Sequence, residues 1–330
     1  MIILQIYSYE RGHMRDKVII IGAGMMGSGI AAMSALSGRG TILIDTSEAQ
    51  LKSGLEKAIS SIRLRKQNEL NSKDDSERAL SLIKTSLSIE KSCKEAFFVI
   101  EAINENLALK QDIFQQIDKI VPPDIPICSN TSGLRITEIS QKCAHPERTI
   151  TTHFWLPAHL VPLVEVVMGE KTGDTIAVKV MSELKKWQKE PILVRKDCPG
   201  QLANRIFQAI IREAVDIVAS GLASAEDVDK AISCGMAMRF PVWGPLTHLD
   251  AIGLDLGLRV QDAVLPNICA EKEGNPYLKE MIDNGNLGVQ SGKGFYNWNE
   301  RNIESAIIRR NRFIIEAVKI LRNLEIEPEE

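Results

Sequence analysis

The chain has 330 residues, a formal net charge of −3 at pH 7 and a hydrophobic fraction of 44%. This length allows two domains with buried cores, and the charge argues against the strongly basic surface of a nucleic-acid-binding protein. The six cysteines form no C-x-x-C pair and the five histidines are dispersed, so we expect a reduced, cytoplasmic protein with no disulfide framework and no metal site.

Residues 1–16 precede the first expected strand, and we interpret them as an N-terminal extension without an assigned function. They lack the order of basic region, apolar core and small-residue cleavage site that marks a signal peptide. Met14 is an alternative start under this interpretation.

A dinucleotide-binding fingerprint follows. A β-branched run at Val18–Ile21 predicts a buried strand, and the small apolar segment Met25–Leu36 predicts a helix packed tightly on a sheet. The glycines between them have the spacing G-x-G-x-x-G, which permits a sharp turn, close approach of a pyrophosphate to the backbone, and close packing of helix on strand. The fingerprint residues expected to bind the cofactor are Gly22, Ala23, Gly24, Met25, Met26 and Gly27.

Asp45 indicates which dinucleotide fits. It follows a second expected strand, Thr41–Ile44, at the position where a carboxylate binds a ribose diol and repels a 2′-phosphate, so the sequence predicts NAD rather than NADP. One alternative is a glycine-rich contact that binds no ligand. Another is a membrane span, because Val18–Gly38 carries no charge. The glycines and serines of this segment make a lipid-facing helix unfavourable, so we expect no membrane association.

The expected helix Glu48–Arg65 has a basic end. We interpret its cations as a solvated helix face, and the alternative is a landing site for substrate phosphates. The residues concerned are Lys57, Arg63, Arg65 and Lys66. Asn71–Ser76 is polar and typical of a loop, and Thr85–Ile89 is a candidate strand.

Polar residues follow two further expected strands. The buried strand Ala96–Ala102 contains Glu101 near its end, and Glu105 lies just beyond it. The strand Ile125–Cys128 is followed by Ser129–Gly133, a cluster of small hydroxyl and amide side chains. Carboxyl ends of parallel strands border the crevice where ligands bind in open α/β sheets. Turn chemistry alone also explains the second cluster, and a binding role is an equal alternative.

His153 and Glu165 are the candidate catalytic pair. Arg148–Phe154 predicts a strand that carries His153, and Val161–Val167 predicts an apolar strand that contains Glu165. An ionised carboxylate buried among valines is unfavourable unless it is paired, and His153 lies across one turn. An isolated histidine is more often structural, but this combination favours catalysis. We interpret His159, in the turn, as solvent-facing or substrate-lining.

The second half of the sequence changes character. Gly173–Lys189 predicts a helix and Pro191–Val194 a last strand, after which only helices are expected. We therefore place a nucleotide-binding domain at 17–195 and a helical substrate and dimerisation domain at 196–330. Surplus apolar helix faces in such a domain favour a homodimer.

From Lys17 to about Tyr296 the sequence resembles the 3-hydroxyacyl-CoA dehydrogenase family. Two of the matching motifs, the glycine fingerprint and Asp45, are shared with unrelated dehydrogenases, whereas the remaining six together are specific. These are EAINEN at 101–106, SNTS at 129–132, HFW with PLVEVV at 162–167, DCPG at 197–200 followed by Asn204, WGP at 243–245 and SGKGFY at 291–296.

This resemblance implies a Rossmann-like α/β fold, a doubly wound and mostly parallel sheet, with an all-helical C-terminal domain. It implies that His153 is the catalytic base and Glu165 its carboxylate partner, that Ser132 and Asn204 bind the reacting oxygen, and that Glu105 and Lys110 contact the cofactor. The chain departs from the family at Leu156, where Asn is common, at Gln290, where Lys is common, and at Ala58, which aligns with a serine that meets CoA.

The resemblance therefore implies an enzyme, an NAD-dependent oxidoreductase that interconverts a 3-hydroxy and a 3-keto group, with a 3-hydroxyacyl-CoA as the leading substrate. Free hydroxy acids or related alcohols are the alternative, because the segment 153–167 also looks like that of the L-gulonate, L-carnitine and pyridine-ring dehydrogenases. A non-catalytic NAD(H)-binding protein is the alternative from another class, although pure binding requires no buried carboxylate.

Overall fold

The computed structural model describes residues 16–324, which form two compact units that meet in sequence at Ala203 and Asn204. The first unit is built on one eight-stranded sheet with the order β3-β2-β1-β4-β5-β6-β7-β8. The strands in chain order are β1 (Lys17–Ile21), β2 (Gly40–Ile44), β3 (Ile83–Ser86), β4 (Ala96–Glu101), β5 (Ile127–Ser129), β6 (Thr149–Phe154), β7 (Leu163–Met168) and β8 (Glu190–Val194).

Strand direction changes once across this sheet. The strands from β3 to β6 are all parallel to one another, in the order typical of a dinucleotide-binding sheet. β7 is antiparallel to β6 and parallel to β8. The strand order places β1 beside β4, so the turns after Ile21 and Glu101 border the switch point where such sheets bind ligands.

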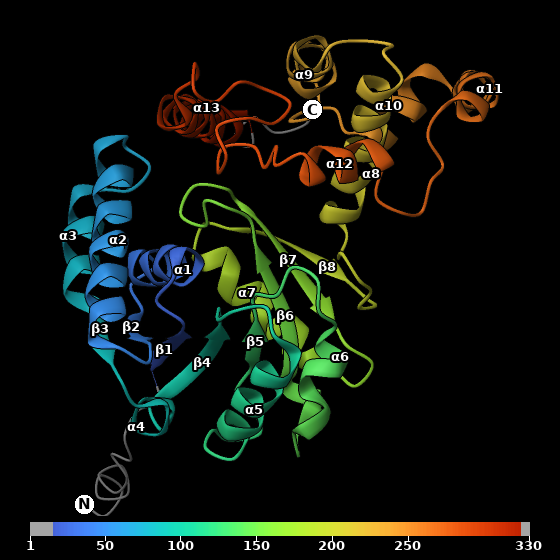
Figure 1. Cartoon of the computed structure of the whole chain (residues 1–330). Helices are drawn as coiled ribbons and strands as arrows, with labels where there is room; N and C mark the ends of the chain where they lie inside the picture. The colour runs from blue at the N-terminus through green and yellow to red at the C-terminus, as the bar shows by residue number, and fades with distance from the viewer. Residues whose placement is uncertain (1–15, 325–330) are drawn as a thin grey trace, which may run out of the picture. The chain divides into compact units, whose positions relative to one another are not determined.

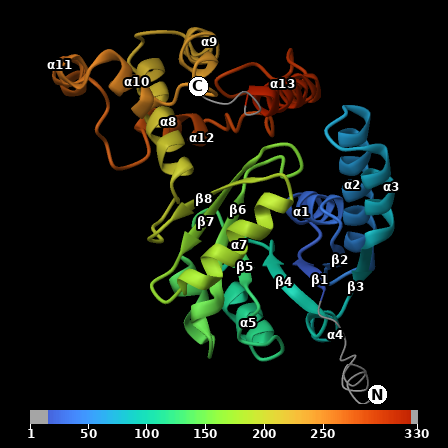
Figure 2. The same ribbon diagram turned by 180° about the vertical axis from the view of Figure 1, so that it is seen from behind.

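Helices cover both faces of the sheet (Figures 1 and 2). One face packs on α1 (Met25–Leu36), α2 (Glu48–Gln67), α3 (Lys73–Leu82) and α7 (Asp174–Lys186), and the other packs on α4 (Ile89–Cys93), α5 (Leu107–Asp118) and α6 (Ile136–Ile139). β1 shows why: Val18 and Ile20 join the first core cluster, and Ile19 and Ile21 join the second. Such a strand, apolar on both faces, is the one predicted from its β-branched run.

The second unit is helical. Its elements are α8 (Ala203–Ala219, whose first residue belongs to the first unit), α9 (Ala225–Cys234), α10 (Pro245–Ile252), α11 (Leu254–Val264), α12 (Pro276–Asp283) and α13 (Ile303–Leu324). Within residues 204–324 the only β-structure is a pair of isolated bridges near Lys293. The predicted fold class, a doubly wound sheet followed by a helical part, is confirmed. Over residues 16–324, no helix has the length and apolar character needed to cross a bilayer.

Two local expectations were wrong. The polar segment 71–76 is not a loop, because the Ser72 side chain accepts a hydrogen bond from the Asp75 amide and starts α3. The strand expected at 85–89 lies earlier, at β3, because Ser88 caps α4 through the Lys91 amide and ends the extended segment. In both places a serine cap decides where the helix begins.

Candidate active site

The first turn of the nucleotide fold requires glycine at two of its three fingerprint positions. Gly22 has a φ of 107°, and a Cβ at this residue would lie 2.5 Å from the carbonyl oxygen of Ala102 on the neighbouring strand. A Cβ on Gly27 would collide with the carbonyl oxygen of Gly22. Gly24 differs, because no atom lies within 4 Å of its Cβ position. The turn is therefore close-packed at Gly22 and Gly27 and open at Gly24, where a pyrophosphate needs to approach.

Asp45 lies directly after β2 and faces this turn. Its Oδ2 accepts a hydrogen bond of 2.8 Å from the Ala23 amide, and its Oδ1 accepts one of 2.7 Å from the Thr46 amide. A cavity of about 390 Å³ opens here, and Gly24, Asp45 and Ile103 are among its lining residues. The α1 N-terminus has no side-chain cap and borders the same turn, which suits an anionic ligand.

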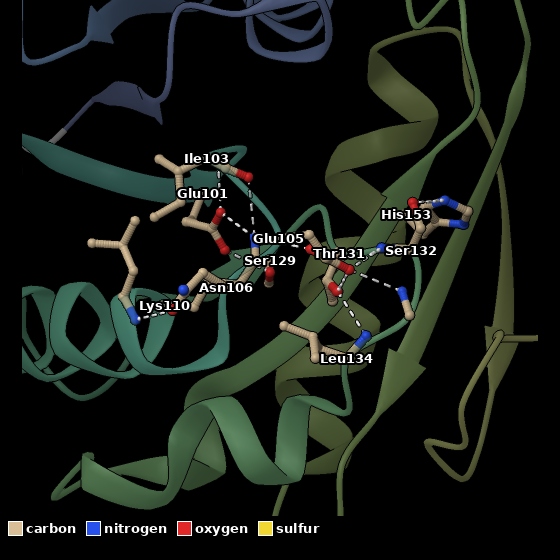
Figure 3. Close-up of polar contacts among 12 residues, drawn as sticks. Glu101, Ile103, Glu105, Asn106, Lys110, Ser129, Thr131, Ser132, Leu134 and His153 are labelled. Carbon is tan, nitrogen blue, oxygen red and sulfur yellow. Dashed lines mark hydrogen bonds and ion pairs between the residues drawn. The ribbon is translucent and has the colours of Figure 1, made fainter. Parts of the chain in front are cut away.

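Lys110 occupies a buried ion pair next to this turn (Figure 3). Its side chain is only 1% exposed, and its Nζ lies 2.6 Å from Oε1 of Glu101, which is fully buried at the end of β4. Glu101 also accepts hydrogen bonds from the Ser129 hydroxyl at 2.6 Å and the Ile103 amide at 2.7 Å. The sequence placed Glu101 at the ligand crevice, whereas the structure places it in the core as the counter-ion of Lys110.

Glu105 lies between this ion pair and the loop that follows β5. Its Oε1 accepts hydrogen bonds from the Thr131 hydroxyl and from the amides of Ser132 and Gly133, and its Oε2 lies 3.4 Å from Lys110 Nζ. Burial raises the pKa of Glu105, but the bonds from Thr131 and Gly133 and the charge of Lys110 outweigh it, so this pKa lies below its ordinary value.

His153 and Glu165 are directly opposite each other in the antiparallel pair β6–β7. This register puts both side chains on one face of the sheet, and His153 Nδ1 lies 2.7 Å from Glu165 Oε2. The pairing that the sequence predicts for these two residues is present. His153 is 7% exposed and Glu165 is fully buried.

Glu165 is held by four hydrogen-bond donors. Oε2 receives the His153 ring nitrogen and the Trp155 indole N–H, the latter at 3.0 Å. Oε1 receives the backbone amides of Leu202 and Ala203, at the start of α8, at 2.8 and 2.7 Å. Burial raises the pKa of Glu165, but the bonds from His153, Ala203 and Trp155 more than offset it and lower this pKa below its ordinary value. A buried carboxylate with all four positions filled stays ionised and fixes its partners.

The other ring nitrogen of His153 meets Ser132. His153 Nε2 lies 3.1 Å from the Ser132 hydroxyl oxygen, and Ser132 is exposed at the carboxyl ends of the strands. Because Glu165 can only accept, we assign the ring proton to Nδ1, where it forms the hydrogen bond to this carboxylate. The lone pair of Nε2 is then free to accept a proton. The arrangement is that of a general base oriented by a carboxylate, beside a hydroxyl that can hold a reacting oxygen.

Other predicted residues lie elsewhere. Asn204 is in the first turn of α8 and is the first residue of the helical unit. His159 is half-buried in the turn after β6, and burial, helped by the charges of Lys189 and Arg65, lowers the pKa of His159 to about 4. Arg65 is 2% exposed and donates to Asn71, to the carbonyl of His159 and to Gln188, so its interpretation as part of a solvated face was wrong.

Sequence reasoning missed the remaining partners of Glu165. Trp155 is only two residues from His153, and its indole N–H was the available signal, because a buried tryptophan normally finds an acceptor. The amides of Leu202 and Ala203 carry no sequence signal, since every residue other than proline has one.

Comparison with known proteins gives two family matches. The family model of the 3-hydroxyacyl-CoA dehydrogenase NAD-binding domain matches residues 17–198. The family model of the 3-hydroxyacyl-CoA dehydrogenase C-terminal domain matches residues 200–298. A probable 3-hydroxybutyryl-CoA dehydrogenase of Bacillus subtilis is 34% identical over 286 residues, covering 86% of this chain and 98% of the relative.

A second kind of relative is named for a substituted pyridine substrate. The 5-formyl-3-hydroxy-2-methylpyridine 4-carboxylate 5-dehydrogenase of Mesorhizobium japonicum is 29% identical over 308 residues, covering 93% of this chain and 99% of the relative. A crystal structure of an enzyme of this name, described as an NAD+-dependent dismutase, superposes with a TM-score of 0.86 at 27% identity, covering 93% of this chain and 98% of the other.

Proposed function

The chain belongs to the 3-hydroxyacyl-CoA dehydrogenase family and is an NAD-dependent oxidoreductase, and from this membership we propose that it interconverts the 3-hydroxy and 3-keto forms of a 3-hydroxyacyl-CoA. The observation that carries the proposal is the His153 imidazole, held on one side by Glu165 and open on the other toward Ser132. A base oriented in this way, in a domain that binds NAD, matches the removal of a hydroxyl proton during oxidation of an alcohol.

His153 is the general base of the proposed reaction. In the oxidative direction its Nε2 takes the proton of the substrate hydroxyl, and NAD, when bound, supplies the acceptor for the hydride that leaves the carbinol carbon. Glu165 holds the proton on Nδ1 and stabilises the imidazolium that forms. Ser132 and Asn204 hold the oxygen as it becomes a carbonyl. In reduction His153 returns the proton.

The fingerprint turn and Asp45 hold the cofactor in this proposal. The open Cβ position of Gly24 and the uncapped start of α1 support binding of the pyrophosphate by residues 22–27. The Asp45 carboxylate on the cavity wall supports binding of the adenosine ribose. Glu105 is exposed near the same turn, and Lys110, whose ammonium is buried, contributes through the two carboxylates it contacts.

Kinetics on a substrate panel test this proposal. We expect acetoacetyl-CoA with NADH to exceed free 3-keto acids by a wide margin in kcat/KM. We expect His153→Gln to lower kcat by about 10²- to 10⁴-fold while the Kd for NADH stays nearly unchanged, because a positioned base contributes that much. A His153→Gln variant with wild-type turnover would remove this residue from the base role.

A free hydroxy acid or a related ring alcohol is the second candidate substrate. Three features of α2 favour it. Ala58, aligned with the serine that meets CoA, is fully buried, and Arg65 is turned into the core. Lys66 is paired with Glu77 at 3.0 Å, which weakens the basic face as a site for the phosphates of CoA. The pyridine-ring relative supports the same alternative. Higher kcat/KM on free acids than on CoA esters would establish it.

We also propose a homodimer formed through the helical domain, in a cytoplasmic enzyme of fatty acid metabolism. Large apolar side chains exposed on this unit support the dimer, among them Leu246, Leu254, Leu258, Ile308 and Phe313. The absence of disulfides among the six cysteines supports a reducing compartment. In the same proposal residues 17–195 bind NAD and 196–330 bind substrate, and the two family matches support this division. Light scattering on the purified protein measures the oligomeric state.

A further inference from the structure

The loop that carries Ser132 depends on one carboxylate from another part of the chain. Thr131 Oγ1, Ser132 N and Gly133 N lie 2.5, 3.2 and 3.0 Å from the same oxygen, Oε1 of Glu105 (Figure 3). The Leu134 amide closes the loop on the Thr131 hydroxyl at 3.0 Å. Thr131 is buried, whereas Ser132 and Gly133 are exposed, so the bonds to Glu105, rather than burial, set the position of these last two residues.

Glu105 is itself fixed on its other side. Its Oε2 lies 3.4 Å from the Nζ of Lys110, and Lys110 is anchored at 2.6 Å by the buried Glu101. The residue that follows Glu105, Asn106, caps α5 through the Leu109 amide at 3.0 Å, which fixes the backbone at the start of this helix. The carboxylate therefore connects the core of the sheet to an exposed loop.

This connection ends at the candidate base. The Ser132 hydroxyl lies 3.1 Å from His153 Nε2, so any movement of the loop changes the distance between the serine and the imidazole. A displacement of about 1 Å in a catalytic group costs on the order of 100-fold in rate. Ser132 donates its backbone amide to Glu105 and places its hydroxyl beside His153. The position of the Glu105 carboxylate therefore sets the distance between the Ser132 hydroxyl and the imidazole.

We propose that Glu105 is a positioning residue, which holds the 131–133 loop so that Ser132 meets the substrate oxygen beside His153. This inference rests on the proposed function, because it assumes that Ser132 and His153 act in the reaction. The family resemblance implies that Glu105 contacts the cofactor, and the role proposed here, which acts through Ser132, is additional to that contact. The two roles predict different behaviour of kcat and of NADH affinity.

A double-mutant cycle tests the inference. For Glu105→Ala we expect kcat to fall by about 30- to 100-fold while the Kd for NADH, measured by fluorescence, changes less than about threefold. In a Ser132→Ala background the same Glu105→Ala change should lower kcat by less than about threefold, because the loop no longer carries the hydroxyl. The matched control is Asp112→Asn in α5, the helix that begins just after Glu105, because it breaks an exposed ion pair, with Lys142, outside the site.

Three outcomes would overturn the inference. One is an equal loss of kcat from Glu105→Ala in both backgrounds, which indicates independent action. Another is a rise in NADH Kd as large as the loss of kcat, which indicates a cofactor contact alone. The third is unchanged kcat in Glu105→Ala. If Glu105→Ala does not fold, Glu105→Gln keeps one acceptor oxygen but turns its amide toward Lys110, and we expect a loss of about 3- to 30-fold with the same dependence on Ser132.

A measurement without substrate separates this inference from the proposed function. If the wild-type enzyme turns over neither CoA esters nor free acids, the proposed function fails and kinetics no longer report on Glu105. Hydrogen exchange followed by mass spectrometry still does, because the Ser132 and Gly133 amides donate to this carboxylate. Glu105→Ala should accelerate exchange in the peptide covering 130–134 at least tenfold, and Asp112→Asn should not. Unchanged exchange in that peptide would overturn the inference whatever the substrate is.

Discussion

Replacing Glu165 by glutamine tests the centre of the site with almost no change in volume. The carboxylate offers two acceptor oxygens, and each accepts two hydrogen bonds: Oε2 from His153 and Trp155, Oε1 from the Leu202 and Ala203 amides. A glutamine side chain has a single acceptor oxygen and an NH₂ group that can only donate. An NH₂ group that faces the Leu202 and Ala203 amides meets two donors that it cannot satisfy. An NH₂ group that faces His153 and Trp155 meets one such donor, the indole N–H, because the imidazole can change tautomer and accept.

The cost to stability follows from the number of donors that lose their acceptor. A buried donor without a partner costs about 1–3 kcal/mol, so the loss is about 1–3 kcal/mol with the NH₂ group toward His153 and about 2–6 kcal/mol with it toward the two amides. For a domain of this size we expect the apparent Tm to fall by roughly 2–20 °C, which differential scanning calorimetry measures directly. Glu190→Gln, an exposed substitution on the adjacent strand β8, is the control and should stay within about 0.5 kcal/mol of the wild type.

The cost to activity comes from the histidine tautomer. If the glutamine NH₂ faces His153, Nδ1 becomes the acceptor and the proton moves to Nε2, which can then no longer take a proton from the substrate. Loss of the orienting carboxylate in His–carboxylate pairs lowers kcat by about 10⁴-fold. We expect a loss of about 10³- to 10⁴-fold in Glu165→Gln, with little change in the Kd for NADH.

The pH dependence has a definite sign. The pKa of Glu165 is lowered below 4.5 in the folded state, so the unfolded chain takes up its proton first as the pH falls. The stabilisation from this carboxylate is complete above pH 4.5 and is lost as the pH falls through the folded-state pKa. The Tm difference between wild type and Glu165→Gln should therefore be constant at neutral pH and narrow in acid. A variant with wild-type Tm and kcat within tenfold of wild type would refute this reasoning.

Three further predictions concern residues around the site. Asp45→Asn should raise the Kd for NADH about tenfold and lower the ratio of the Kd for NADPH to the Kd for NADH, because the variant no longer repels a 2′-phosphate. Fluorescence titration with both cofactors measures these constants. Lys110→Met should cost about 3–5 kcal/mol in urea unfolding, because Glu101 loses its buried cation, and adding Glu101→Gln should recover part of that loss. Burial and nearby cations lower the pKa of His159 to about 4, so the unfolded chain binds its proton first, and stability should fall by up to about 3 kcal/mol between pH 6.5 and 4. Urea unfolding at pH 4.5 and 7.5 should show a smaller fall in His159→Gln.

Features with a local pattern could be predicted from the sequence. The fingerprint turn was predictable because Gly22 and Gly27 leave no space for a Cβ, a constraint that also fixes the residue type. Glu165 was predictable as a paired residue because a carboxylate among valines requires compensation, and His153 was the nearest candidate. In both cases the physical requirement acts over a short stretch of chain.

Features made by distant segments could not be predicted. Arg65 shares the helical spacing of the buried Ala58 and Ile62, but an arginine is normally exposed unless it is paired. It is buried because Asn71, the carbonyl of His159 and Gln188 converge on it. In the sequence, Glu101 is typical of a ligand-facing acid at the end of a strand. The structure shows that Lys110, on the following helix, binds its carboxylate. Each of these side chains is explained by its partner, and the partner is determined by tertiary packing rather than by sequence spacing.

The reversal of strand direction between β6 and β7 explains why the pair could be inferred at all. A parallel neighbour to β6 would need a crossover connection of a dozen or more residues, whereas an antiparallel one follows after a short turn, here residues 155–162. The short turn fixes the register, and the register places Glu165 opposite His153 on one face; a slip of one residue would turn the carboxylate to the other face. The geometry of the His153–Glu165 pair is therefore a property of one hairpin. The amides of Leu202 and Ala203, the last two residues of the first unit, bind the other carboxylate oxygen, so a segment far from the hairpin in sequence fixes the same side chain.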